Sequence, residues 1–202
     1  MINKQAVTNE EIHPVLKNRW SPRAFSDIAV ENSKIVRMFE AAQWSPSASN
    51  EQPWSFIIGL KGDETYNKIY DTLVEFNQLW AITAPILILN CGRTMSLKNA
   101  GKPNTHYLYD AGQAAAHLTF QASSDGLFVH QMAGFDAEKA AEAFMLPTDF
   151  VAVTVIAVGY IGDPEVLHPN LKKIEYNKRE RRDLSQTVFS GNFGEPAGLI
   201  SR

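Results

Sequence analysis

Two apolar runs constrain the fold of this chain more than any other feature of its sequence. The run from Pro85 to Asn90 is short and continuously apolar, which is typical of a strand buried on both faces of its sheet. The segment from Val151 to Val158 is the most strand-like in the chain, and Trp54–Leu60 is a third run rich in β-forming residues. We therefore expect these strands to form a central sheet that is flanked by helices.

Helical periodicity fills the segments between the strands. We predict helices from Asp27 to Ser45, from Gly62 to about Val74, from Thr105 to Ser124 and from Ala137 to Met145. The third of these has a broad Ala-rich face, which suits close helix packing and a dimer interface. Asp136 is the expected N-cap of the fourth, because its carboxylate can accept a backbone hydrogen bond from the first turn.

The chain is expected to form one domain. It has no internal repeat, low-complexity tract or composition shift, and helices outnumber the strands that they separate, so a single α+β domain over residues 1–202 is predicted. Hydrophobic residues make up 45% of the chain and charged residues 20%, which favours a folded protein over a disordered one. Residues 185–202 are rich in Gly and Pro and could form an extended arm.

Charge and motif content exclude several classes of function. The formal net charge of -3 argues against a partner among nucleic acids or anionic membranes. The five His residues have no metal-ligand spacing and Cys91 is the single cysteine, so no metal site is expected. Signatures of dinucleotide-binding, Walker A and serine hydrolase sites are missing. Met1–Val7 carries no apolar core of signal-peptide length, and a cytoplasmic protein is expected.

A stiff amide-bearing loop lies between the first predicted helix and the strand at Trp54. The loop, Ser45–Pro53, contains two prolines, which fix φ and remove backbone donors. Its Ser, Asn and Gln side chains offer both donors and acceptors, which suits the edge of a planar heterocycle that displays carbonyls and ring nitrogens. The alternative is an ordinary Ser/Pro-rich connection.

Two basic clusters lie near the ends of the chain. Arg19, Ser21 and Arg23 form an Arg-x-Ser-x-Arg motif, which places two guanidinium groups and a hydroxyl where phosphate oxygens could bind. Near the C-terminus, Lys172-Lys173 and the run 178–182 form a second cluster. Each cluster taken alone could instead be a solvated surface.

Taken together, the motifs Arg19–Phe25 and Pro46–Phe56 resemble the nitroreductase family of flavin enzymes. Their patterns, Arg-x-Ser-x-Arg-x-Phe and Pro-Ser-x-x-Asn-x-Gln-Pro-Trp-x-Phe, match the family in register. The resemblance implies a nitroreductase-like α+β fold with a mostly antiparallel sheet flanked by helices. It also implies an intertwined homodimer whose FMN sites are shared between the subunits, with the amide loop contributed by the other subunit.

The resemblance assigns roles to individual residues. Arg19 and Ser21 match phosphate-binding positions, whereas Arg23 matches the cation near the ribityl chain and the N1/C2 edge of the flavin; its alternative is a surface salt bridge with Asp27. Arg182 competes with Arg181 for the last phosphate position. The implied flavin-binding residues are Arg19, Trp20, Ser21, Arg23, Pro46, Ser47, Ala48, Asn50, Gln52, Asn77, Gln131, Met132, Ala133, Gly134, Arg179 and Arg181.

The run from Gln131 to Gly134 matches the backbone beneath the flavin ring, with an N–H near N5. Ala133 stands where many members of the family have an acidic residue. His130 is either a proton donor or, as we favour, a structural histidine. Asn77 is either a contact of the flavin edge or a helix-capping residue.

The implied activity is hydride transfer from NAD(P)H through flavin N5 to an electron-poor planar acceptor, such as a nitroaromatic or a quinone, by a ping-pong mechanism. No catalytic side chain is expected, because the flavin carries the chemistry. The alternative is an FMN carrier or redox-sensing module that does not turn over NAD(P)H.

Overall fold

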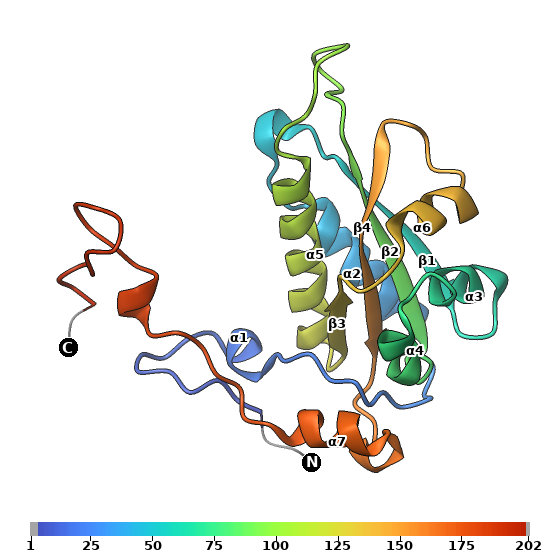
Figure 1. Ribbon diagram of the computed structural model, residues 1–202, viewed down its shortest axis with the longest axis horizontal. Helices are drawn as coiled ribbons and strands as arrows, with labels where there is room; N and C mark the ends of the chain where they lie inside the picture. The colour runs from blue at the N-terminus through green and yellow to red at the C-terminus, as the bar shows by residue number, and fades with distance from the viewer. Residues whose placement is uncertain (1–3, 201–202) are drawn as a thin grey trace.

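The computed structural model describes residues 4–200 and shows a four-stranded sheet with helices on both faces (Figure 1). Met1–Asn3 and residues 201–202 lie outside the described residues. Part of the prediction about a signal peptide falls on the first segment, and part of the prediction about an extended C-terminal arm falls on the second. The strands are β1 (Trp54–Leu60), β2 (Ile86–Arg93), β3 (Phe128–Met132) and β4 (Phe150–Gly159), in the order β1-β2-β4-β3. Every neighbouring pair is antiparallel. The predicted α+β fold with an antiparallel sheet flanked by helices is confirmed.

Strands β2 and β4 form the centre of the sheet and are buried on both of its faces. Along β2, Leu87 and Leu89 join one hydrophobic cluster, and Ile86 and Ile88 join the other. All four side chains are at most 1% exposed. The prediction of a doubly buried strand after Pro85 is therefore confirmed, and each face needs its own cover of helices.

Helices α2 (Asn32–Gln43) and α5 (Tyr107–Ser124) cover one face. Small side chains on α5 allow the two helices and the sheet to approach closely; Ala111, Ala114, Ala115 and Ala122 are at most 1% exposed. The Ala-rich face thus serves close packing, as predicted. Its buried alanines are committed to the core of the protomer itself.

Three further helices cover the other face: α3 (Glu64–Tyr70), α4 (Glu75–Ala81) and α6 (Ala137–Ala143). Helix α7 (Pro169–Tyr176) lies beyond one end of the sheet, where its Leu171 joins the same hydrophobic cluster (Figure 1). Trp80 of α4 is fully buried there and stacks on Phe25 at a centroid distance of 6.4 Å. The remaining elements are short. They are α1 (Pro14–Asn18) and the 3-10 turns η1 (Ala48–Asn50), η2 (Pro164–Val166) and η3 (Leu184–Gln186).

Some predicted boundaries are wrong, and tertiary contacts explain the largest difference. The helix expected to continue to about Val74 ends at Tyr70, because the next residues pair with the loop after β3. Leu73 forms a β-bridge with Phe135, and the Val74 N–H donates to the Gly134 carbonyl at 3.2 Å. A new helix, α4, then begins. Helices α1 and α7 were likewise not predicted from the sequence.

The other boundary errors are smaller. The helix expected from Asp27 begins at Asn32, with Glu31 at its N-cap, and the helix expected from Thr105 begins at Tyr107. The Asp136 cap is confirmed, since its side chain accepts from the Lys139 N–H. Within residues 4–200, no helix has the length and apolar character needed to cross a membrane.

The chain after α7 runs away from the sheet alongside the N-terminal segment (Figure 1). It ends in a small turn in which Phe189 bridges to Pro196 and the Ala197 N–H donates to the Val188 carbonyl at 3.1 Å. Phe193 at the tip of this turn is 95% exposed. Residues 185–200 therefore have local structure of their own and little apolar cover.

The contact between α3 and β1 gives a first testable prediction. A Cβ added at Gly59 of β1 would lie 2.3 Å from the backbone nitrogen of Tyr66 in α3. Because backbone cannot yield as a side chain can, we expect Gly59→Ala to lower the free energy of unfolding by about 3 kcal/mol in urea titrations.

Gly112 of α5 is the matched control, because a Cβ there meets nothing within 4 Å. Gly112→Ala should leave stability unchanged or raise it by up to about 1 kcal/mol, since alanine favours the helix. Equal stabilities for the two variants would contradict the prediction.

Candidate functional site

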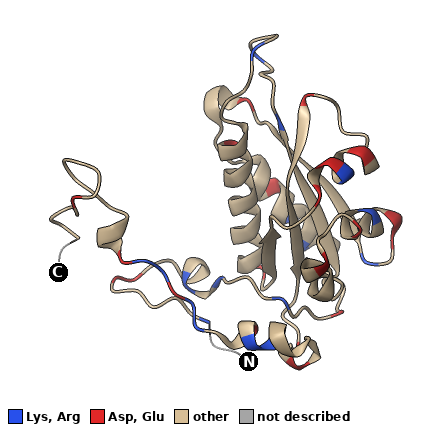
Figure 2. Cartoon of the chain, viewed as in Figure 1, with Lys and Arg blue, Asp and Glu red and all other residues tan. Residues whose placement is uncertain are grey.

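A basic cavity of about 300 Å³ lies where α7 meets the N-terminal segment. Figure 2 shows Lys and Arg on α7 and along the segment that follows it. The structure thus brings together the two basic clusters, which lie near opposite ends of the sequence. The residues that line the cavity are Lys4, Arg19, Trp20, Ser21, Arg23, Ile174, Glu175, Asn177, Lys178, Arg179 and Arg181. Arg182, the competing candidate, does not line it.

The N-terminal motif forms one wall of this cavity. Arg19 is the C-cap of α1, and its Nη1 lies 3.3 Å from the Ser21 hydroxyl oxygen, to which it donates. The Trp20 ring is buried, packs edge-on against Phe128 of β3 and lies under the Lys4 ammonium at 5.3 Å. The Trp20 side chain is thereby occupied, which leaves its backbone for any contact with a ligand.

The cations in the cavity repel one another. Burial lowers the pKa of Arg19, and the charges of Arg179 and Arg181 lower it further. Burial and the Arg181 charge lower the pKa of Arg179 in the same way. Burial is also the main cause of a lowered pKa at Lys4. A bound anion would relieve this repulsion, so the cavity favours an anionic group.

The carboxylate that faces the cavity belongs to Glu175, which the sequence analysis missed. Its side chain is fully buried and its Oε2 lies 3.8 Å from Arg23 Nη1. Within the described part of the chain this is the ion pair of Arg23, so the alternative of a salt bridge to Asp27 is wrong. Glu175 follows the buried Leu171 by four residues, a helical spacing that places both on the inner face of α7.

Strand β3 extends the site away from the basic cavity. His130 Nδ1 lies 2.8 Å from the Pro22 carbonyl oxygen, and Trp80 packs on the imidazole at a centroid distance of 4.4 Å. Burial lowers the pKa of His130 to about 4, so the ring is neutral near pH 7. Because the carbonyl can only accept, the neutral ring carries its proton on Nδ1. These contacts match a structural histidine that joins β3 to the arginine motif.

The residues after His130 differ in what they expose. Gln131 and Ala133 are exposed, whereas the Met132 side chain is buried in the core. The Gln131 amide donates to the Thr119 hydroxyl at 3.2 Å. The run therefore presents backbone and small or polar side chains on one side, with Met132 as its anchor in the core.

Asn77 lies inside α4 and fixes the end of this run. Its amide nitrogen donates to the Gly134 carbonyl at 2.8 Å, and a Cβ on Gly134 would lie 2.7 Å from that nitrogen. Val74 is the N-cap of α4, so the alternative of Asn77 as a capping residue is wrong. A chain of contacts thus connects the basic cavity, β3 and α4.

The amide loop lies elsewhere in the protomer. Figure 1 shows η1 at the end of α5 that is opposite to α1 and α7. Pro46 and Asn50 are exposed, and the Ser47 hydroxyl accepts from the Gln52 N–H at 3.0 Å. Of the sequence-predicted residues, those from the arginine motifs, β3 and α4 are therefore brought together, and those from this loop are not.

Three non-glycine residues of the amide loop have a left-handed backbone conformation, with φ of 53° at Ser49, 54° at Asn50 and 47° at Gln52. Two buried carboxylates hold the loop in this shape. Asp110 of α5 accepts from the Ala48 N–H at 3.1 Å. Glu51 accepts from the Ser96 hydroxyl and from the Leu97 N–H at 2.7 Å. None of these supports was predicted from the sequence.

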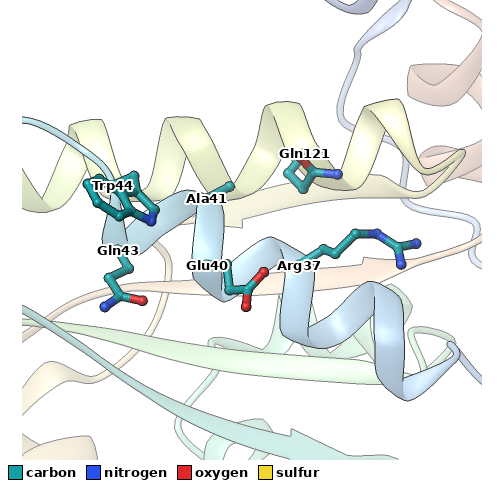
Figure 3. Close-up of a pocket in the computed structure, with 6 residues that line it drawn as sticks. All are labelled: Arg37, Glu40, Ala41, Gln43, Trp44 and Gln121. Carbon is teal, nitrogen blue, oxygen red and sulfur yellow. The ribbon is translucent and has the colours of Figure 1, made fainter.

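A second, larger cavity of about 400 Å³ is a groove between α2 and α5 (Figure 3). The arginine that lines it, Arg37, already forms two hydrogen bonds to the Asp125 carboxylate, at 3.0 and 3.1 Å. That hydrogen-bonded pair raises the pKa of Arg37, in contrast to the arginines of the basic cavity. None of the sequence-predicted site residues lines this groove, and the basic cavity is the better candidate.

Several known proteins are similar to this chain. A family model described as "Nitroreductase family" matches residues 16–78. A crystal structure of an "oxidoreductase containing FMN" aligns with a TM-score of 0.87 and 31% identity, over 96% of this chain and 98% of that one. An uncharacterized 15.4 kDa protein of Mycolicibacterium smegmatis is 34% identical over 149 residues, 70% of this chain and 98% of its own.

A protein of Archaeoglobus fulgidus named "Putative NADH dehydrogenase/NAD(P)H nitroreductase" is 25% identical over 158 residues, which cover 76% of this chain and 87% of the relative. The family model's match includes both the arginine motif at Arg19 and the amide loop at Ser45–Pro53, since both lie within residues 16–78.

The support of the amide loop gives a second prediction. Asp110→Ala removes the acceptor of the Ala48 N–H, and an unpaired donor of this kind costs about 1–3 kcal/mol. We expect amide hydrogen exchange across residues 47–52 to become at least about tenfold faster in this variant. Asp110→Asn keeps an acceptor oxygen and should restore most of the protection.

Gln113→Ala is the control on the same helix, because its amide contact with the Pro46 carbonyl is long, at 3.4 Å. Its exchange should match that of the unsubstituted protein. Unchanged exchange in Asp110→Ala would show that the carboxylate does not hold the loop.

Proposed function

The chain belongs to the nitroreductase family, and on that basis we propose that it is an FMN-dependent oxidoreductase that passes hydride from NAD(P)H to an electron-poor planar acceptor. The observation that carries the proposal is the basic cavity, which contacts through His130 and Asn77 connect to β3 and α4. The FMN of the similar crystal structure and the name of the archaeal relative support the cofactor and the electron donor. Nitroaromatics and quinones are the acceptor class that we propose.

The residues present fit the FMN phosphate. The charges of Arg179 and Arg181 lower the pKa of Arg19, the Arg181 charge lowers that of Arg179, and Glu175 is the one carboxylate among the residues that line the cavity. In addition, Arg23 Nε is buried without a hydrogen-bond partner among the described residues. A phosphate dianion would neutralise this excess charge through charge-assisted hydrogen bonds. Ser21 offers a further hydroxyl donor beside Arg19.

The rest of the proposed site follows the chain of contacts away from the cavity. We assign Arg23 to the ribityl chain and the N1/C2 edge, and the backbone of Gln131–Gly134 to the ring. Asn77 would act by fixing the Gly134 carbonyl and by offering its side chain to the ring edge. Met132 anchors this run through its buried side chain. The small side chain of Ala133 leaves the neighbourhood of N5 open and apolar.

FMN, when bound, supplies the two-electron chemistry. The fixed charge of Arg23 favours the negative charge that reduction adds near the N1/C2 edge. No side chain needs to act as nucleophile or acid, and His130 is neutral near pH 7 and holds its proton toward the Pro22 carbonyl. The protein would bind and orient the flavin and polarise it through the charge of Arg23.

We further propose that a second copy of the chain completes the site. The amide loop, with Pro46, Ser47, Ala48, Asn50 and Gln52, lies at the far end of α5 from the basic cavity (Figure 1). One protomer therefore cannot offer both to the same flavin. A homodimer in which the loop of one subunit meets the cavity of the other satisfies both assignments.

The absorption spectrum of the purified protein tests the function directly. We expect a yellow protein that releases FMN on denaturation and loses its visible absorption when NADH or NADPH is added without air. A yellow protein that neither nicotinamide bleaches would point to a flavin carrier or redox sensor. A colourless protein that takes up no added FMN would overturn the proposal.

The two neighbouring arginines give a matched pair of variants. Arg181 lines the basic cavity and Arg182 does not, although both are exposed. We expect Arg181→Ala to weaken FMN binding about tenfold, equivalent to about 1.4 kcal/mol, as measured by quenching of FMN fluorescence on titration with apoprotein. Arg182→Ala should change the dissociation constant less than twofold. An equal effect of both substitutions would show that only net charge matters.

A further inference from the structure

We propose that Glu175 is a positioning residue with two separable effects: one carboxylate oxygen holds the backbone of the arginine motif, and the negative charge limits the positive potential of the basic cavity. The inference rests on the proposed function, because it assigns a purpose to this residue in the same site. It gives the site a built-in counter-charge that weakens anion binding and lowers the reduction potential of the flavin.

The first effect follows from the contacts of Oε1. This oxygen accepts from the Arg23 N–H at 2.8 Å and from the Ala24 N–H at 3.3 Å. The side chain that provides it is fully buried on α7. Two consecutive backbone amides are thus fixed to a helix that lies far away in the sequence. Arg23 cannot shift relative to α7 without breaking both bonds.

The second effect follows from the other oxygen. Oε2 lies 3.8 Å from Arg23 Nη1, beyond hydrogen-bond distance, and is buried without a hydrogen-bond partner among residues 4–200. Arg23 Nε is likewise buried and unpaired in that part of the chain. The Glu175 charge also acts on the Lys4 ammonium, whose pKa it raises against the effect of burial. This oxygen therefore acts on the cavity through its charge rather than through a directed bond.

A neutral isostere separates the two effects. In Glu175→Gln, the amide oxygen can still accept from the Arg23 and Ala24 N–H groups, but the buried negative charge is gone. The cavity then carries more net positive charge at the same geometry. An incoming phosphate should bind more tightly, and the negative charge that reduction adds to the flavin should be better stabilised.

The experiment compares Glu175→Gln with Glu175→Asp, which keeps the charge, and with Glu180→Gln. Glu180 is exposed beside Arg179 and Arg181, so it controls for the loss of a solvent-screened charge nearby. Three quantities are measured: calorimetric binding of inorganic phosphate to apoprotein, the FMN dissociation constant, and the midpoint potential of the bound flavin.

For Glu175→Gln we expect phosphate and FMN to bind at least about threefold more tightly and the midpoint potential to become more positive. Glu175→Asp should keep a potential near that of the unsubstituted protein, and Glu180→Gln should change none of the three quantities. A folded Glu175→Gln with unchanged phosphate affinity and potential, or with weaker binding, would overturn the proposal.

If Glu175→Gln does not fold, the same comparison is made in a chain that also carries Arg23→Gln, in which no buried guanidinium is left unpaired. That double variant should bind phosphate more tightly than Arg23→Gln alone, and equal affinities would overturn the proposal. The proposed function fails separately, if the unsubstituted protein takes up no FMN; the phosphate measurements still decide the role of Glu175.

Discussion

The burial of β2 and β4 on both faces is the constraint on which the rest of the structure depends. A sheet whose central strands are apolar on both sides needs two covers, and α2 with α5 supplies one of them. The other is assembled from α3, α4 and α6, and Leu171 of α7 joins the same cluster from beyond the end of the sheet (Figure 1). Because Leu171 anchors α7 in this cluster, the docked helix carries Glu175 and the following arginines to the N-terminal motif. The anchoring of α7 in the core thus places one wall of the basic cavity.

The electrostatic state of that cavity follows from the same docking. Several cations share a small volume with a single buried carboxylate, and their lowered pKa values express the cost of their mutual repulsion and burial. The groove between α2 and α5 is larger, but the Arg37 guanidinium in it already forms a bidentate pair with Asp125. That pair neutralises the charge of Arg37, so the groove does not favour an added anion. Size alone would favour the groove over the basic cavity. Unbalanced charge, combined with the unpaired nitrogen of Arg23, is what favours the basic cavity as the candidate site.

Local signals explain what the sequence could predict. The bounds of β1 and the Asp136 cap depend on neighbouring residues, and both predictions are confirmed. The break between α3 and α4 could not be predicted, because it results from the pairing of Leu73 with Phe135 across a long stretch of chain. Glu175 was missed for the same reason: its spacing from Leu171 indicates a buried face, but only the docked helix shows what it faces. The residues of the proposed flavin site came from the family motifs, and they stay a prediction.

The amide loop is held in a strained backbone conformation by its own subunit, without any contact from a partner subunit. Left-handed backbone at residues such as Ser49 and Gln52 costs of the order of 1–3 kcal/mol each, and it persists only where the surroundings hold it. Hydrogen bonds to charged acceptors contribute about 1.5–3 kcal/mol; Asp110 accepts one from the Ala48 N–H of the loop, and Glu51, itself in the loop, accepts one from the Leu97 N–H. The two terms are of similar size, so the strained shape can be the resting shape. A loop already fixed by its own subunit loses little further conformational entropy when it meets the cavity of a partner, which favours a rigid, shared site.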